Sequence, residues 1–330
     1  MTNQLQLGKF NLNKTQVTQF LLEYLVFFGI LVLVIITAII QPNFLTAQNF
    51  TNLMRQFGPL SFVALGMTFI IIGGFIDLSV PGLISIVAII TLSLVDTIGE
   101  APAMLIGLLL GTSLGCLNGS VLVISGASTQ AKALFITYGM SQLYGAIALF
   151  HTGGRSINRT LIAHPMPITT AIGTGMVGFL SLSFVIFLCF LVILYIFQSK
   201  TLFGRYINYT GGNIVAAELN GIPTKRIMVL IYAICGFMAA VGAMVLFSRV
   251  TVTTPTVGAG FERDAIMSVV VGGTSLMGGK GSVVRTMLGV SLVVLMSNCM
   301  NLLGVQTHLQ EVLRGAILVT AIWLDHRRHL

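Results

Sequence analysis

The chain contains repeated apolar stretches that are long enough to cross a lipid bilayer as helices. A transmembrane α-helix needs about 20 mostly apolar residues. Six stretches have about this length: Leu21–Ile40, Leu78–Val95, Met104–Ile124, Met176–Phe197, Ile227–Phe247 and Val283–Leu303. Only 8% of the 330 residues are charged, whereas a soluble domain has about 25%. The sequence therefore predicts an all-α, polytopic integral membrane protein.

Four further segments are shorter or more polar: Leu60–Ile72, Ala133–Phe150, Ala265–Val271 and Val312–Trp323. Several of them are too short or too rich in glycine to cross alone as straight helices. Interrupted spans of this kind occur in transporters, where irregular backbone can line a cavity inside the protein. We therefore predict about ten transmembrane helices, including short or interrupted ones. Eight spans, with two short segments merged, is the alternative.

The distribution of Lys and Arg favours an orientation with both termini in the cytoplasm, because cytoplasmic loops carry an excess of these residues. With ten spans, the residues at the cytoplasmic face are Lys9, Lys14, Lys132, Lys200, Arg205, Lys225, Arg226, Lys280, Arg285, Arg327 and Arg328. Those outside or in the outer half are Arg55, Arg155, Arg159, Arg249, Arg263 and Arg314. The net charge of +8 then reflects topology, and we expect no binding to nucleic acid.

The chain is expected to form one transmembrane domain over residues 21–325. A cytoplasmic segment, residues 1–20, precedes it, and a cytoplasmic tail, residues 326–330, follows it. The first apolar run is interpreted as a retained span and not as a removed signal peptide.

The segment Lys200–Arg226 is polar although it lies between two apolar stretches, and in this orientation residues 199–226 form a cytoplasmic loop. Ile214–Leu219 predicts a short amphipathic helix. Asn213 can accept a hydrogen bond from a free backbone N–H group at its start, and Gly221 suits its end. A helix that lies on the membrane only to close the loop is the alternative interpretation, but the segment is longer than closure requires.

Two apolar segments end in the same Gly-Gly pair. Residues 64–74 read ALGMTFIIIGG and residues 265–273 read AIMSVVVGG, which indicates two related halves. We expect helix breaks or gates at Gly73, Gly74, Gly272, Gly273, Gly278 and Gly279.

A single acid, Asp77, follows the first Gly-Gly pair. A charge at membrane depth is costly, so we expect Asp77 at a helix break that faces protein or water. Two interpretations remain. Asp77, helped by Ser79, caps the helix that starts near Leu78, which we favour, or it is a coupling or gating carboxylate. A proton relay would need further acids or histidines, and none lies near in the sequence.

No pattern in the sequence indicates an enzyme. The segment 272–282 is rich in glycine, but Gly281 follows Lys280 where a phosphate-binding loop has Ser or Thr. The four cysteines lie apart within apolar runs, which argues against a disulfide or a metal site. We therefore expect no catalytic residues, no bound metal and no bound cofactor.

Two spacings predict helix contacts. Gly107, Gly111, Gly115 and Gly119 recur every four residues, which lets another helix approach closely. Glu311 and Arg314 have the spacing of a pair on one helix face.

Short motifs along roughly residues 40–325 resemble the permeases of bacterial ABC importers for ribose and related monosaccharides. These motifs are Pro42-Asn43-Phe44, Asn49-Phe50, Ala64–Thr68, Gly74, Ile76–Ser79, Gly204–Ile207, Gly211–Asn213, Ala216-Ala217, Gly221-Ile222, Asp264–Ile266, Gly272–Gly281 and Asn301–Val305. The sequence departs from the family pattern at Pro81, where glycine is usual, and at Lys132, where an apolar residue is usual.

The resemblance implies a permease that forms the translocation pathway for a monosaccharide such as ribose. It implies a second permease subunit, identical or closely related, a periplasmic sugar-binding protein, and an ABC ATPase at the cytoplasmic face that uses the ATP. The chain would lie among the lipids of the bacterial inner membrane. The helix near Asn213 resembles the coupling helix that contacts the ATPase, and its residues are Asn213, Ala216, Ala217, Glu218, Gly221 and Ile222.

An ion- or proton-coupled secondary transporter of a small polar solute is the alternative function. It shares the multi-span plan, but the shortage of acids within the spans argues against it.

Overall fold

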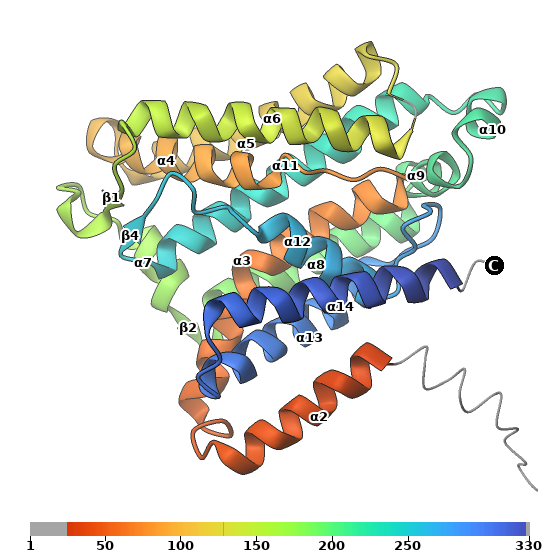
Figure 1. Cartoon of the computed structure of the whole chain (residues 1–330). Coiled ribbons are helices and arrows are strands. Elements are labelled where there is room, and N and C mark those ends of the chain that lie inside the picture. Colours follow the sequence, from red (N-terminus) through yellow and green to blue (C-terminus); the bar gives the residue numbers. More distant parts are fainter. Residues whose placement is uncertain (1–24, 128, 328–330) are drawn as a thin grey trace, which may run out of the picture.

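The computed structural model describes residues 25–127 and 129–327, which form an all-α bundle (Figure 1). The longer helices are α2 (Leu25–Ile40), α3 (Ala47–Ile72), α4 (Val80–Ile98), α5 (Glu100–Ile124), α6 (Gln130–Thr152), α8 (Leu182–Lys200), α11 (Thr224–Arg249), α13 (Val283–Leu302) and α14 (Thr307–Arg327). The shorter helices are α7 (Pro167–Thr174), α9 (Leu202–Gly212), α10 (Ile214–Leu219) and α12 (Phe261–Val271), with a 3₁₀ turn at Arg159–Leu161. Two small antiparallel sheets pair β1 (Ile157–Asn158) with β4 (Val252–Thr253) and β2 (Met176–Val177) with β3 (Leu180–Ser181).

The helices confirm the multi-span all-α prediction. Within the part of the chain that the structure describes, seven helices are long and apolar enough to cross a membrane: α3, α4, α5, α6, α8, α11 and α13. Each of the ten predicted segments overlaps a helix. The first predicted segment begins outside the described residues, as does the predicted segment 1–20. The predicted tail starts inside α14, which continues to Arg327.

The prediction of a span from Met176 is wrong at its start. Met176–Ser181 forms the β2–β3 hairpin, in which Gly178 has φ +62°, a conformation that glycine adopts easily. The Ser181 hydroxyl then accepts a hydrogen bond from the Phe184 backbone N–H at 3.4 Å and caps α8. Gly178 and the apolar residues on both sides of it therefore form a β-hairpin and do not begin the helix.

The central helix is α3, which is buried continuously from Phe57 to Ile72. α11 packs between α3 and α5, and α13 packs against α3 and α12. Buried polar pairs also join α3 to α13: the amides of Asn49 and Asn298 exchange hydrogen bonds of 3.1 and 2.9 Å. α5, α6 and α8 lie at the periphery and leave many apolar side chains exposed, as lipid-facing helices do.

The two ends of the bundle differ (Figure 1). One end, here called the α10 end, holds α9, α10, the start of α2 and the end of α14. The opposite end, here called the α7 end, holds α7, β1 and β4. At the α7 end the Glu100 carboxylate accepts hydrogen bonds from the backbone N–H groups of Ile168 and Thr169, at 2.8 and 2.5 Å. It thereby caps α7, a contact between distant residues that the sequence analysis missed.

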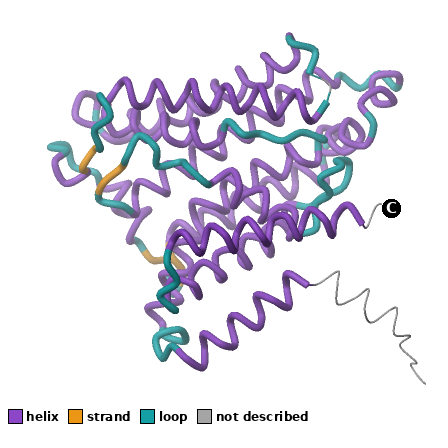
Figure 2. The backbone as a smooth tube through the Cα atoms, in the orientation of Figure 1, coloured by secondary structure: helices purple, strands orange, loops and turns teal. Residues whose placement is uncertain are grey.

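Two non-helical segments run into the bundle before a helix starts (Figure 2). Residues 73–79 precede α4, and residues 254–260 precede α12. The backbone N–H of Gly258 donates a hydrogen bond of 3.1 Å to the hydroxyl of Ser85, in the second turn of α4. The segment 254–260 therefore packs against the first turns of α4, the helix that the segment 73–79 precedes.

Candidate coupling site

The short helix predicted after Asn213 is present and projects from the α10 end (Figure 1). The side-chain oxygen of Asn213 accepts a hydrogen bond from the Ala216 backbone N–H at 2.9 Å. Gly221 follows the helix with φ +77°, and the Ile222 N–H closes the turn on the Ala217 carbonyl at 3.0 Å. The local sequence was sufficient here because both ends of α10 are fixed by residues next to it.

α9, which precedes it, was not predicted. The Thr201 hydroxyl accepts a hydrogen bond from the Gly204 N–H at 3.2 Å and caps its start. Ile207 is buried, whereas Phe203 and Tyr209 are exposed. The capping threonine and the spacing of the apolar residues could have predicted α9. The two glycines and two asparagines near the end of the segment argued against a helix, because these residues have low helix propensity.

The predicted coupling residues on α10 divide into two groups. Ala216 and Glu218 are exposed, together with Val215 and Leu219, which were not predicted. Ala217 is only 4% exposed and packs inward. The outer face of α10 is therefore small and largely apolar, which suits contact with another protein.

Glu218 and Ile222 lie where α10 turns into α11. The Glu218 carboxylate accepts a hydrogen bond of 2.6 Å from the hydroxyl of Thr224, the first residue of α11. Ile222 is half-buried against the core. These contacts fix α10 to the start of a long central helix.

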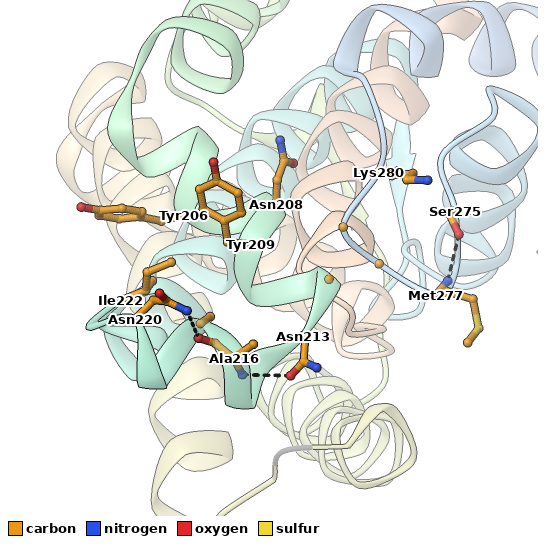
Figure 3. Close-up of a pocket in the computed structure, with 14 residues that line it drawn as sticks. Tyr206, Asn208, Tyr209, Asn213, Ala216, Asn220, Ile222, Ser275, Met277 and Lys280 are labelled. Carbon is orange, nitrogen blue, oxygen red and sulfur yellow. Dashed lines mark hydrogen bonds between the residues drawn. The ribbon is translucent and has the colours of Figure 1, made fainter.

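A pocket of about 900 Å³ lies between α9, α10 and the segment Ser275–Lys280 (Figure 3). Residues on its walls include Tyr206, Tyr209, Asn213, Ala216, Met277 and Lys280. Met277 is 66% exposed and Lys280 is exposed. The α10 end therefore offers a protruding helix beside a recess, a shape into which a partner protein can fit.

The α10 end is positively charged. It contains the start of α6, the end of α8, the start of α11 and the loop before α13 (Figure 1). The basic residues on these elements, on α9 and in the first turn of α13 are Lys132, Lys200, Arg205, Lys225, Arg226, Lys280 and Arg285. The acid of α10 is Glu218. This excess matches the face that the positive-inside rule assigns to the cytoplasm.

The two Gly-Gly pairs make the same turn, so the structure confirms the internal similarity. After α3, the backbone N–H groups of Gly73, Gly74 and Phe75 donate to the carbonyls of Phe69, Ile71 and Ile70, respectively. After α12, the equivalent N–H groups of Gly272, Gly273 and Thr274 donate to the carbonyls of Ser268, Val270 and Val269. The value of φ is +84° at Gly74 and +83° at Gly273. Each helix thus ends in a turn that favours glycine in its second position.

The prediction that Asp77 caps a helix is wrong. α4 begins at Val80, and Ser79 occupies the capping position without a side-chain capping bond. The Asp77 carboxylate instead accepts hydrogen bonds from the Ser79 N–H at 2.8 Å and the Ser79 hydroxyl at 2.6 Å. Asp77 reaches only two residues ahead, as Asp does in turns, and it stabilises the non-helical segment.

A chain of buried polar groups continues from Ser79. The side-chain NH₂ of Asn118 donates to the Ser79 hydroxyl at 2.7 Å, and the Tyr144 hydroxyl donates to the side-chain oxygen of Asn118 at 2.6 Å. The segment 75–79 is thereby tied to α5 and α6. Its polar groups have partners in the protein interior, as membrane burial requires.

The glycine-rich segment 272–282 contacts several elements at the α10 end. The Gly279 N–H donates to the Ile72 carbonyl at the end of α3, at 2.8 Å. The Gln198 side chain, at the end of α8, donates to the Gly281 carbonyl at 3.0 Å and accepts from the Val283 N–H at 3.1 Å. Gln130 of α6 donates to the Leu276 carbonyl at 3.0 Å. The predicted break residues Gly278 and Gly279 contact Gly211 and Gly212 of α9 and line the pocket beside α10.

The predicted pairing of Glu311 with Arg314 is wrong. Arg314 pairs with Asp264 of α12 at 2.6 Å, and Glu311 pairs with Arg263 of the same helix at 2.7 Å. The spacing permits a pair within α14, but α12 packs alongside and brings a nearer partner to each charge.

Comparison with known proteins identifies the family. Residues 49–322 match the family described as the permease component of the branched-chain amino acid transport system. The chain is 35% identical to the ribose import permease protein of Haemophilus influenzae over 94% of this chain and 95% of that protein. This chain belongs to that permease family.

Further relatives agree with this membership. The permease is 34% identical to the ribose import permease protein of Bacillus subtilis, over 92% of each chain. It is 29% identical to the xylose transport system permease protein of Escherichia coli K12, over 86% of each chain. No solved structure gives a significant match.

Pro81, one of the two departures from the family pattern, fits the observed fold. It lies in the first turn of α4, where proline is favoured because its missing N–H is not needed. Lys132, the other departure, is exposed in the first turn of α6 at the α10 end.

Proposed function

We propose that this permease is the membrane-spanning subunit of an ATP-driven importer for a monosaccharide such as ribose. The relatives named for ribose import cover almost the whole chain, which supports the substrate class. The observation that carries the proposal is α10: a capped helix with an exposed apolar face, beside a pocket, on the positively charged end of a membrane protein. Such a helix suits docking to a cytoplasmic protein.

The docked partner in this proposal is an ABC ATPase, which binds and hydrolyses the ATP. The α10 end then faces the cytoplasm, together with both termini, and the permease lies in the bacterial inner membrane. A periplasmic sugar-binding protein delivers substrate at the α7 end. A second permease subunit, identical or closely related, completes the pathway.

The proposal is tested by uptake into proteoliposomes that contain the permease and its ATPase, supplied with ribose-loaded binding protein. Radiolabelled ribose should accumulate only when ATP and the ATPase are both present. Leucine, tested in parallel because of the family's description, should not be taken up. Accumulation driven by an ion gradient without the ATPase would favour the alternative, a secondary transporter.

Leu219→Asp should weaken ATPase docking at least about tenfold. Leu219 is 84% exposed on α10, so its replacement does not disturb the core. An unpaired neutral polar group in an apolar contact costs about 1 to 3 kcal/mol, and a carboxylate costs more. A cost of 1.4 kcal/mol already corresponds to a factor of about ten. The measurement is the amount of ATPase that co-purifies with the permease.

Leu161→Asp is the matched control, because Leu161 is 80% exposed at the α7 end. It should leave the co-purifying ATPase unchanged. Equal binding by Leu219→Asp and the unaltered permease would remove α10 from the docking surface.

A further inference from the structure

Several backbone segments meet without intervening side chains beside α9. A methyl group on Gly211, near the end of α9, would overlap the Ile72 carbonyl oxygen and lie 2.8 Å from the Gly279 nitrogen. A methyl group on Gly278 would lie 2.6 Å from the Gly211 carbonyl oxygen and 2.8 Å from the Gly74 Cα. These positions have no room for a side chain. We call Gly74, Gly211, Gly278, Gly279 and the Ile72 carbonyl the glycine junction.

Directed bonds hold the glycine junction in addition to close packing. The Gly279 N–H donates to the Ile72 carbonyl at 2.8 Å, which joins the segment 272–282 to the end of α3. Gln198 is only 9% exposed and makes two hydrogen bonds to the other end of the same segment, at Gly281 and Val283. Because buried hydrogen bonds of this kind are costly to break, the contact behaves as one unit.

The glycine junction connects α10 to two non-helical segments, one before α4 and one before α13. On one side, α9 leads from Gly211 through Asn213 directly into α10. On the other side, Gly74 opens the segment 75–79 that leads to α4, and Gly278 and Gly279 lie in the segment that leads to α13. Close-packed backbone transmits a displacement because it cannot be compressed. A displacement of α10 is therefore passed to both segments.

We infer that the glycine junction transmits movement of α10 to the segments 73–79 and 272–282, and that Gly211 and Gln198 are positioning residues for this coupling. The inference rests on the proposed docking of an ATPase to α10. It assigns a role to the second Gly-rich segment, for which the sequence alone indicated only a break. It also separates two steps, docking of the ATPase and transmission of its movement.

Two variants disrupt the junction in different ways. Gly211→Ala places a methyl group against the Ile72 carbonyl, whereas Gln198→Ala removes two hydrogen bonds and adds no atoms. Gly145→Ala is the control, because a methyl group there meets no atom within 4 Å and alanine favours helix more than glycine does. Gly145 lies inside α6, outside both the pocket and the glycine junction. Each variant is reconstituted with the ATPase, and three quantities are measured: co-purifying ATPase, ATP hydrolysis, and ribose transported per ATP hydrolysed.

Gly211→Ala and Gln198→Ala should retain the ATPase and its hydrolysis but transport at least tenfold less ribose per ATP. Gly145→Ala should match the unaltered permease in all three quantities. If Gly211→Ala does not accumulate in the membrane, Gln198→Ala decides alone.

Three results would overturn the inference: normal transport per ATP in Gln198→Ala, loss of ATPase binding in that variant, or an equal defect in Gly145→Ala. Failure of the proposed function is distinguishable, because the unaltered permease would then show no ATP-dependent ribose uptake.

Discussion

Gly115→Leu should prevent the permease from accumulating in a folded form. Gly115 lies on α5 where that helix touches α11: a methyl group there would overlap the Tyr232 carbonyl oxygen and lie 3.0 Å from the Gly236 Cα. Leucine adds three more carbons, and the obstacle is backbone, so the two helices must separate. Overpacking of an ordinary core site costs about 1 to 3 kcal/mol. Separating α5 from α11, which pack against each other extensively, costs more, and a protein's total stability is only about 5 to 15 kcal/mol.

The measurement is the size-exclusion profile of a fluorescently tagged permease in mild detergent, before and after heating. Gly145→Leu is the control, because a methyl group at Gly145 meets no atom within 4 Å and Gly145 lies inside α6, a peripheral helix. It should give a monodisperse peak close to that of the unaltered permease. A normal peak and normal melting for Gly115→Leu would show that α5 and α11 do not pack as the structure has them.

The contact at Gly115 illustrates which features the sequence could predict. The glycines at 107, 111, 115 and 119 lie on one helix, and their spacing of four residues places them on one face whatever the rest of the fold is. The structure confirms that this face meets another helix. The sequence analysis did not identify the partner helix, although Gly236 and Ala240 on α11 are small residues with the same spacing of four.

The candidate site also contains one feature that the local sequence could predict and another that it could not. α10 could be predicted because Asn213 and Gly221, its two end residues, are adjacent to it in sequence. The glycine junction could not, because it unites three segments that are far apart in the chain. Local reasoning also chose the wrong partner for Asp77, since a carboxylate can bond to the nearest N–H in a turn as readily as to the start of a helix.

Arg314→Ala should destabilise the permease by about 2 to 4 kcal/mol. Arg314 pairs with Asp264 at 2.6 Å, and their side chains are only 24% and 20% exposed. The guanidinium also donates to the Ser297 hydroxyl at 3.1 Å, so it joins α12, α13 and α14. Removing one member of a largely buried pair leaves the other charge without compensation, which costs up to about 3 to 5 kcal/mol when burial is complete. The loss should appear as a lower melting temperature in detergent.

Arg263→Ala is the matched comparison on the neighbouring pair. Arg263 and Glu311 lie 2.7 Å apart but are 56% and 41% exposed, so removing one does not leave the other buried and unpaired, and the expected loss is below about 1 kcal/mol. The double variant Arg314→Ala/Asp264→Asn should recover part of the stability, because it removes the uncompensated carboxylate. If the double variant melts no higher than Arg314→Ala, the loss comes from packing of the arginine side chain and not from its charge. If Arg263→Ala and Arg314→Ala destabilise equally, burial does not distinguish the two pairs, and α12 is held to α14 by the whole cluster.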